Sequence, residues 1–141
     1  MRTKFVVLGD LGEVAPAFAK YTEGPLLGEL WQRSDLSPRD RSIITVAVLI
    51  ARNQPIEMPY YFNLALDSGV TPTELSEIVT HLAFYSGWAN ATGAATVTKG
   101  VFAERGISEL PPETGERLPI DKAAEAQRAA RVDPLIALRW E

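Results

Sequence analysis

Hydrophobic residues recur at the spacing of an α-helix along most of this chain, and no two segments show the strict alternation that predicts paired β-strands. The first pattern places Val14, Phe18 and Tyr21 on one helix face. Residues 43–50 are almost wholly apolar, which is typical of a helix buried on most sides. Together the patterns predict helices over 12–22, 25–33, 37–52, 55–68, 71–86 and 88–105.

Cap residues mark several of the predicted helix ends. Ser37-Pro38 combines an N-cap hydroxyl with a proline at the first helical position. Thr71 and Glu74 have the spacing of a capping box, in which each side chain accepts a hydrogen bond from the other residue's backbone N–H. Three glycines are expected to end helices: Gly69, Gly87 and Gly106.

Two further prolines are expected to separate helices. Gly24-Pro25 is expected to end the first helix and begin the second, because proline suits the first helical position. Asn53 and Gln54 are expected to end the long apolar helix, and Pro55 to begin the next one.

The patterns divide the chain into three parts. These are an N-terminal arm over 1–11, a helical domain over 12–106, and a connector with a C-terminal helical tail over 107–141, whose helix is expected at 121–131. The tail ends in large apolar residues, Leu135, Ile136, Leu138 and Trp140. Because such an end exposes apolar surface in a monomer, it is expected to pack on a neighbouring subunit. The predicted fold is all-α, with five or six helices and an arm, in a homo-oligomer.

Composition and charge exclude several classes of protein. The chain has 141 residues, 46% of them hydrophobic and 23% charged, as expected for one globular domain. A net charge of −4 argues against a nucleic-acid partner. No apolar run approaches the roughly 18 residues of a membrane span, so we expect a cytoplasmic protein without a membrane partner. The absence of cysteine excludes thiol nucleophiles, thiolate metal sites and dithiol redox chemistry.

One face of the 71–86 helix combines ionisable side chains. Glu77, His81 and Tyr85 follow one another at intervals of four residues and therefore share a face. An imidazole exchanges protons near neutral pH, and a neighbouring carboxylate fixes its tautomer. His81 and Tyr85 are therefore candidate catalytic residues; the alternative is a core or interface histidine paired with Glu77. Because the chain has one histidine, no metal site is expected.

Other predicted helices carry further candidates. Glu57 and Tyr61 lie one turn apart. Glu57 either favourably meets the positive end of its helix, or faces inward among apolar side chains, where a carboxyl group can act as a general acid or base. Arg41 either binds a substrate carboxylate in bidentate geometry or belongs to a surface ion-pair cluster. Trp31 and Trp88 either wall a substrate pocket or pack a subunit contact.

The chain resembles the carboxymuconolactone decarboxylase family over residues 14–105, on the segments SDLSPRDRSIITVAVLIA and GVTPTELSEIVTHLAFYSGW. The resemblance implies the alkylhydroperoxidase-D-like helical bundle, assembled as a trimer or hexamer with pockets near subunit contacts. The family's peroxidase branch has a C-x-x-C-x-x-x-H motif, and its positions here hold Gln54, Glu57 and Tyr61. A cysteine-dependent peroxidase is therefore excluded. The decarboxylase branch has the pattern E-x-x-x-H, of which Glu57 is retained and the histidine is replaced by Tyr61.

The resemblance implies a cofactor-independent decarboxylation of a carboxylated lactone in aromatic-compound catabolism. Such a reaction requires a cation for the substrate carboxylates, a donor for the developing enolate oxygen, and an acid that reprotonates carbon. Arg41 is assigned the first role, Tyr61 or Tyr85 the second, and Glu57 or His81 the third.

The tyrosine at the histidine position leaves two alternatives open. A phenol, with a reference pKa of about 10, does not replace imidazole as a base near neutral pH. The chain is then either a paralogue that acts on another cyclic carboxylated or enolisable substrate, by proton transfer or lactone opening, or a catalytically silent oligomer that binds a small molecule.

Overall fold

The computed structural model describes residues 12–110 and 121–132. Every regular element in these ranges is helical and none is a strand, which confirms the all-α prediction. The chain forms two compact units, residues 1–111 and 112–141, and each is described by itself. The predicted arm over 1–11 and the apolar end over 133–141 lie outside the described residues. Within the described ranges, no helix is both long enough and apolar enough to cross a membrane.

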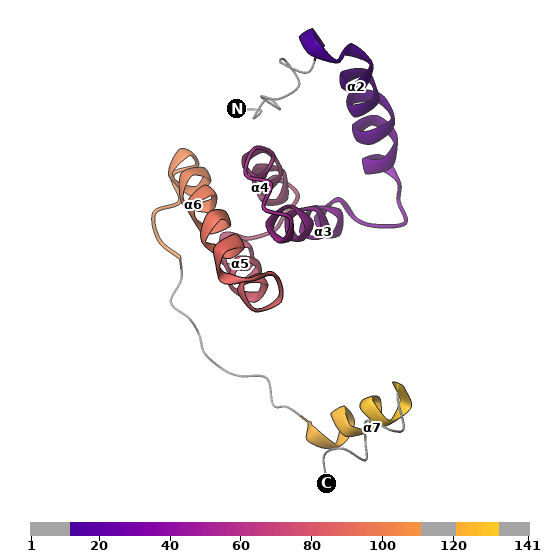
Figure 1. Ribbon diagram of the computed structural model, residues 1–141, viewed down its shortest axis with the longest axis vertical. Helices are drawn as coiled ribbons and strands as arrows, with labels where there is room; N and C mark the ends of the chain where they lie inside the picture. The colour runs from indigo at the N-terminus through magenta and orange to yellow at the C-terminus, as the bar shows by residue number, and fades with distance from the viewer. Residues whose placement is uncertain (1–11, 111–120, 133–141) are drawn as a thin grey trace. The chain divides into compact units, whose positions relative to one another are not determined.

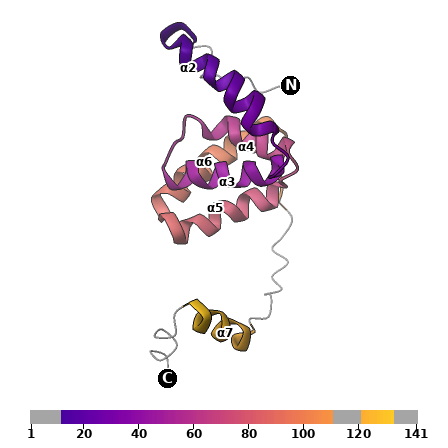
Figure 2. The ribbon, with the colours of Figure 1, turned by 90° about the vertical axis from the view of Figure 1, so that its right-hand side faces the viewer.

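Four helices of the first unit form a bundle in which each helix contacts the other three (Figures 1 and 2). They are α3 (Pro38–Ala51), α4 (Met58–Asp67), α5 (Pro72–Ser86) and α6 (Trp88–Glu104). The largest fully buried apolar side chains of this unit are Phe62, Ile50, Met58, Leu75 and Val46 from the helices, and Val70 from the turn between α4 and α5. The α6 helix contributes mainly small side chains to this core, Ala91 and Ala94 among them, which allows close approach to its neighbours.

The predicted cap residues act as expected. The Ser37 hydroxyl accepts a hydrogen bond from the Asp40 N–H at 3.0 Å. Thr71 and Glu74 form the complete capping box of α5, with bonds of 3.2 and 2.9 Å. Gly87 has a φ of 98°, a left-handed conformation that favours glycine, and it separates α5 from α6.

The predicted break at Gly24-Pro25 is wrong. Helical turns run on from α2 (Pro16–Tyr21) through the π-helical segment η1 (Thr22–Glu29) to the 3-10 turn η2 (Leu30–Gln32). Pro25 lies inside η1. Proline lacks an N–H and its ring clashes with a carbonyl one α-helical turn earlier, whereas the wider π turn relieves that clash without ending the helix.

The start of the fourth predicted helix is also displaced. Residues 55–57 form a turn, and α4 begins at Met58 with Pro59 in its first turn. Asn53 has a φ of 51°, and the Gln54 N–H donates to the Leu49 carbonyl at 2.9 Å, so the chain closes α3 there as expected. The consequence for the site is that Glu57 is the N-cap residue of α4 and not a residue of its first turn.

The second unit contains α7 (Lys122–Val132), close to its predicted range. Asp121 begins it, because the Asp121 carboxylate accepts hydrogen bonds from the backbone N–H groups of Ala123 and Ala124 at 3.0 and 3.1 Å. Most of the described side chains of this helix are exposed.

Candidate functional site

The side chain at the centre of the candidate site is Tyr61, which α4 buries to 8% exposure. The Tyr60 ring meets it edge-on, with ring centroids 5.0 Å apart. The Trp31 ring, which comes from η2, stacks on it at 6.0 Å and 28°. Burial, followed by the nearby Tyr60 and Glu57, raises the pKa of Tyr61 above its usual value of 10.0. The Tyr61 phenol therefore stays protonated, as a hydrogen-bond donor, throughout the neutral range.

Glu57 lies one turn before Tyr61, at the start of α4. Its Oε2 atom is buried and accepts no hydrogen bond from any residue in the described part of the chain. A buried oxygen without a partner is unusual, because leaving it unsatisfied costs on the order of 1–3 kcal/mol. The carboxyl group is therefore placed to accept from, or donate to, a bound molecule.

Arg41 lines a small cavity of about 130 Å³. The cavity is lined by Leu30, Trp31, Leu36, Arg41, Ile44 and Thr45. Trp31 connects this cavity to Tyr61, because the Trp31 ring also stacks on the Tyr61 ring. The cavity is smaller than the typical 300–1,000 Å³ of a ligand site, so a whole substrate extends beyond it.

The Arg41 guanidinium is partly committed to the backbone. Nε donates to the Leu36 carbonyl at 3.2 Å, and Nη2 donates to the Arg33 carbonyl at 3.1 Å. These bonds hold the 33–36 turn against the head of α3. Three of the five N–H groups of a guanidinium remain for a ligand. No carboxylate within the described ranges forms an ion pair with Arg41, so the predicted surface ion-pair cluster does not include it.

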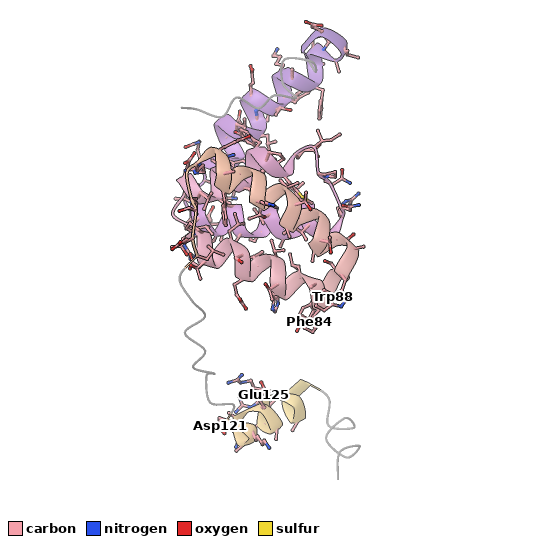
Figure 3. All side chains as sticks on the ribbon, turned by 90° about the vertical axis from the view of Figure 1, so that its left-hand side faces the viewer. Phe84, Trp88, Asp121 and Glu125 are labelled. Carbon is pink, nitrogen blue, oxygen red and sulfur yellow. The ribbon has the colours of Figure 1, made fainter. Side chains whose placement is uncertain are left out.

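The remaining candidates form a second, exposed group at the end of α5. The His81 ring stacks on Tyr85, with centroids 4.7 Å apart, as their spacing of four residues predicts. Phe84 and Trp88 lie side by side at the corner between α5 and α6, with ring centroids 5.6 Å apart (Figure 3). Tyr85, Phe84 and Trp88 are 79%, 76% and 69% exposed in the single chain.

The expected ion pair between Glu77 and His81 is not formed in the described structure. Both side chains are exposed on the outer face of α5, where water competes with the pairing and long side chains lose entropy on pairing. No hydrogen bond, ion pair or ring contact of the described residues links His81 or Tyr85 to Glu57. The structure links Glu57 to Tyr61, Tyr61 to Trp31, and Trp31 to the cavity that Arg41 lines, whereas His81, Tyr85 and Trp88 are exposed at the end of α5 and the start of α6.

A larger cavity of about 810 Å³ lies between α5 and α6, and none of these candidate residues lines it. Among the described residues, its lining contains one charged residue, Lys99, and no acid. Volume alone favours this cavity as the reaction site. The buried acid oxygen of Glu57, the buried phenol of Tyr61 and the cavity of Arg41 lie outside it, in the part of the unit that Trp31 connects.

Sequence reasoning missed two contributors to the first group. Tyr60 is not among the candidates named from the sequence, although it raises the pKa of Tyr61. Thr45, which lines the small cavity, lies one turn after Arg41 and donates to the Arg41 carbonyl at 2.8 Å. The interval of four residues between Arg41 and Thr45 is the signal that could have identified Thr45.

Comparison with known proteins places this architecture in a family. The model of the carboxymuconolactone decarboxylase family matches residues 16–100. A 4-carboxymuconolactone decarboxylase from Acinetobacter baylyi is 30% identical over 101 residues, which are 72% of this chain and 75% of that protein. A nitrosuccinic acid decarboxylase from Metarhizium robertsii is 33% identical over 72 residues, 51% of this chain and 50% of the relative. With its helical bundle and a family match over most of its length, the chain belongs to the carboxymuconolactone decarboxylase family.

Proposed function

We propose that this protein decarboxylates a small carboxylated compound without a cofactor, at the site of Glu57, Tyr61, Trp31 and Arg41. The observation that carries the proposal is the buried, unpartnered Oε2 of Glu57 beside the buried phenol of Tyr61. Membership of the family, and two relatives that are named as decarboxylases, support this class of reaction.

Arg41 binds the substrate in this proposal. Its free N–H groups donate to a carboxylate that remains on the substrate, and no acid of the described residues competes for its charge. Trp31 forms the wall of the small cavity and holds the Tyr61 ring in place by stacking. The substrate then extends from this cavity toward the carboxyl group of Glu57.

The reaction breaks the bond between the departing carboxylate carbon and its neighbour. Carbon dioxide leaves, and the electron pair moves into an adjacent carbonyl group as an enolate. The Tyr61 hydroxyl donates a hydrogen bond to the developing enolate oxygen. The Glu57 carboxyl group transfers a proton to the carbon, which restores the carbonyl, and regains a proton from water.

The proposed substrate class is a carboxylated lactone of aromatic-compound catabolism. The name of the bacterial relative contains such a compound, and that of the fungal relative contains a nitro-substituted diacid. Both compounds combine carboxyl groups with a group that withdraws electrons, which is the feature the mechanism needs. Tyr61 at the histidine position favours a second candidate, a paralogue that acts on another cyclic carboxylated or enolisable compound. A catalytically silent, ligand-binding oligomer is the third.

His81 and Tyr85 take part in the proposed reaction only if the site is shared between subunits. They are the alternatives for acid and donor, and their exposure in the single chain fits a subunit contact of the expected trimer or hexamer. If the site of one subunit includes the exposed α5 face of another, His81 reaches the substrate from there.

The test is carbon dioxide release from 4-carboxymuconolactone by four purified forms: wild type, Glu57→Gln, His81→Ala and the control Glu77→Gln. We expect Glu57→Gln to lower kcat by about 100-fold or more, because a positioned general acid contributes about 10²–10⁴. The control replaces an exposed acid of α5 and should stay within about twofold of wild type.

The outcomes separate the candidate functions. Unchanged turnover in both Glu57→Gln and His81→Ala would overturn the assignment. Wild-type turnover of nitrosuccinate or another carboxylated lactone, without turnover of 4-carboxymuconolactone, would identify a paralogue. Binding of these compounds with no turnover by the wild type would favour the silent oligomer.

A further inference from the structure

We propose that the groove between α5 and α6 is a second binding site, for a small amphipathic monocarboxylate with an aromatic or medium-length apolar body. The groove is lined by residues of α5, α6 and the segment that follows α6. None of the residues proposed to take part in decarboxylation lines it. The inference is therefore independent of the proposed function.

The groove has the size of a ligand site. Its volume is about 810 Å³, within the 300–1,000 Å³ that is typical of pockets for small molecules. Small residues leave this space open, because Ala95 and Ala103 carry only a methyl group and Gly106 carries no side chain. A Cβ added at Gly106 would meet no atom within 4 Å.

The walls and floor of the groove are apolar. Val79 comes from α5, Phe102 from α6, and Ile107 and Leu110 from the segment after α6. Val79 is buried and continuous with the core of the bundle, so it forms a fixed surface. A flat or linear apolar body placed on these side chains would be removed from water, which stabilises binding by about 25 cal/mol per Å² of apolar surface.

The polar groups of the groove select the charge of the ligand. Lys99 is the charged residue among the described residues of the lining, and it forms no ion pair with any of them or with the rest of the described chain. The Ser76 and Ser108 hydroxyls line the same groove and make no hydrogen bond to the described residues, so they remain as donors. Within the described part of the lining, one cation and two hydroxyl donors, without an acid, complement one carboxylate. A diacid would leave its second charge without a partner.

Two other hydroxyls contribute differently. Thr98 and Thr80 donate to backbone carbonyls of their own helices, at 2.8 and 3.1 Å. Because their hydroxyl protons are already donated, Thr98 and Thr80 are not available as hydrogen-bond donors to a ligand carboxylate. A carboxylate is therefore expected to bind at Lys99 and not at these two hydroxyls.

The test uses 2-naphthoate as the probe and its neutral amide, 2-naphthamide, as the matched ligand. Binding is measured by titration of the full-length protein, and position by backbone amide shifts in NMR spectra. We expect naphthoate to bind with shifts at Thr98, Gly106 and Ile107. Lys99→Met should weaken naphthoate about fivefold to tenfold and leave naphthamide unchanged, since it removes one partly solvated charge contact. Lys20→Met, outside the groove, should change neither.

A second variant tests the proposal by filling the groove with a large side chain. Ala103→Trp should abolish binding of both ligands while the circular dichroism spectrum stays that of the wild type. Equal loss of both ligands in Lys99→Met would overturn the charge argument. Shifts confined to Trp31 and Tyr61, or no binding at millimolar probe, would overturn the site. A change of oligomeric mass in Ala103→Trp would show that a second copy, and not a small acid, occupies the groove.

Discussion

At the scale of single residues, the site depends on the relation between Glu57 and Tyr61. Their interval of four residues predicted that they share a face, and the structure places the charge of Glu57 close enough to raise the pKa of Tyr61. The stacking of Trp31 on Tyr61 was not predictable, because it joins residues 30 positions apart across two elements. The pairing of Glu57 with Tyr61 could therefore be predicted from local spacing, whereas the Trp31 ring beside Tyr61 could be found only from the tertiary structure.

The raised pKa of Tyr61 predicts a loss of stability in alkali. The folded protein holds the phenolic proton more tightly than the unfolded chain does, because burial disfavours the phenolate. The resulting stabilisation is complete below the ordinary pKa of 10.0 and is lost as pH rises through the folded-state value. We expect Tyr61→Phe to reduce the slope of unfolding free energy against pH above 10, measured by urea denaturation.

The control for this experiment is Tyr85→Phe, which removes the hydroxyl of an exposed tyrosine on α5. It should leave the alkaline slope as in the wild type. Equal slopes in the wild type and Tyr61→Phe would contradict the burial of the Tyr61 hydroxyl.

At the scale of elements, the sequence predicted helices well and misplaced two boundaries. The caps at Ser37 and Thr71 were readable because each depends on residues within one turn. Pro25 and Pro55 misled for a common reason. A proline is compatible with a helix start, a turn or a π-helical segment, and local sequence alone does not choose among them.

The capping box of α5 predicts an acid-dependent contribution to stability. The Thr71 N–H donates to Glu74 and lowers the pKa of its carboxyl group below 4.5, with the Arg39 charge as a further cause; desolvation partly opposes them. A lowered folded-state pKa gives stabilisation that is present above the unfolded value and lost as pH falls through the folded value. Because the Glu74 side chain is 44% exposed, solvent screening keeps the effect small.

Two variants separate the cap from the charge. Thr71→Ala should lower the free energy of unfolding by about 1 kcal/mol at neutral pH, as loss of a threonine cap usually does. Glu74→Gln keeps an acceptor for the Thr71 N–H but has no proton to gain, so its stability should depend less on pH below about 4.5 than that of the wild type. Denaturant unfolding at pH 7 and pH 3.5 measures both. An identical acid dependence in Glu74→Gln and wild type would contradict the prediction.

At the scale of the whole molecule, the bundle accounts for its core but not for its exposed aromatic groups. All four helices contribute to one cluster of buried apolar side chains. The outer side of α5 and the start of α6 nevertheless expose Phe84, Tyr85 and Trp88, and α3 exposes Ile44 and Val48. The sequence predicted an apolar surface that requires a partner at the C-terminal end, which lies outside the described residues, and the exposed rings of α5 and α6 form a further such surface. This second surface could be found only from the tertiary structure. Helical periodicity identifies which residues are apolar, but it does not show whether another element packs on them.

These exposed rings predict a homo-oligomer, since aromatic side chains are enriched at the centres of subunit contacts and rarely exposed together in monomers. We expect the wild type to exceed the mass of a 15.4 kDa monomer in light scattering after gel filtration. Phe84→Glu combined with Trp88→Glu should release monomers, because a carboxylate buried in an interface without a partner is costly. Thr96→Glu, on an exposed position of α6, is the matched control and should keep the wild-type mass.

A monomeric wild type, or an unchanged mass in the double variant, would show that these rings do not mediate assembly. If monomers form and decarboxylation is lost with them, the exposed α5 face contributes to the site of a neighbouring subunit; if activity persists, one chain holds the complete site.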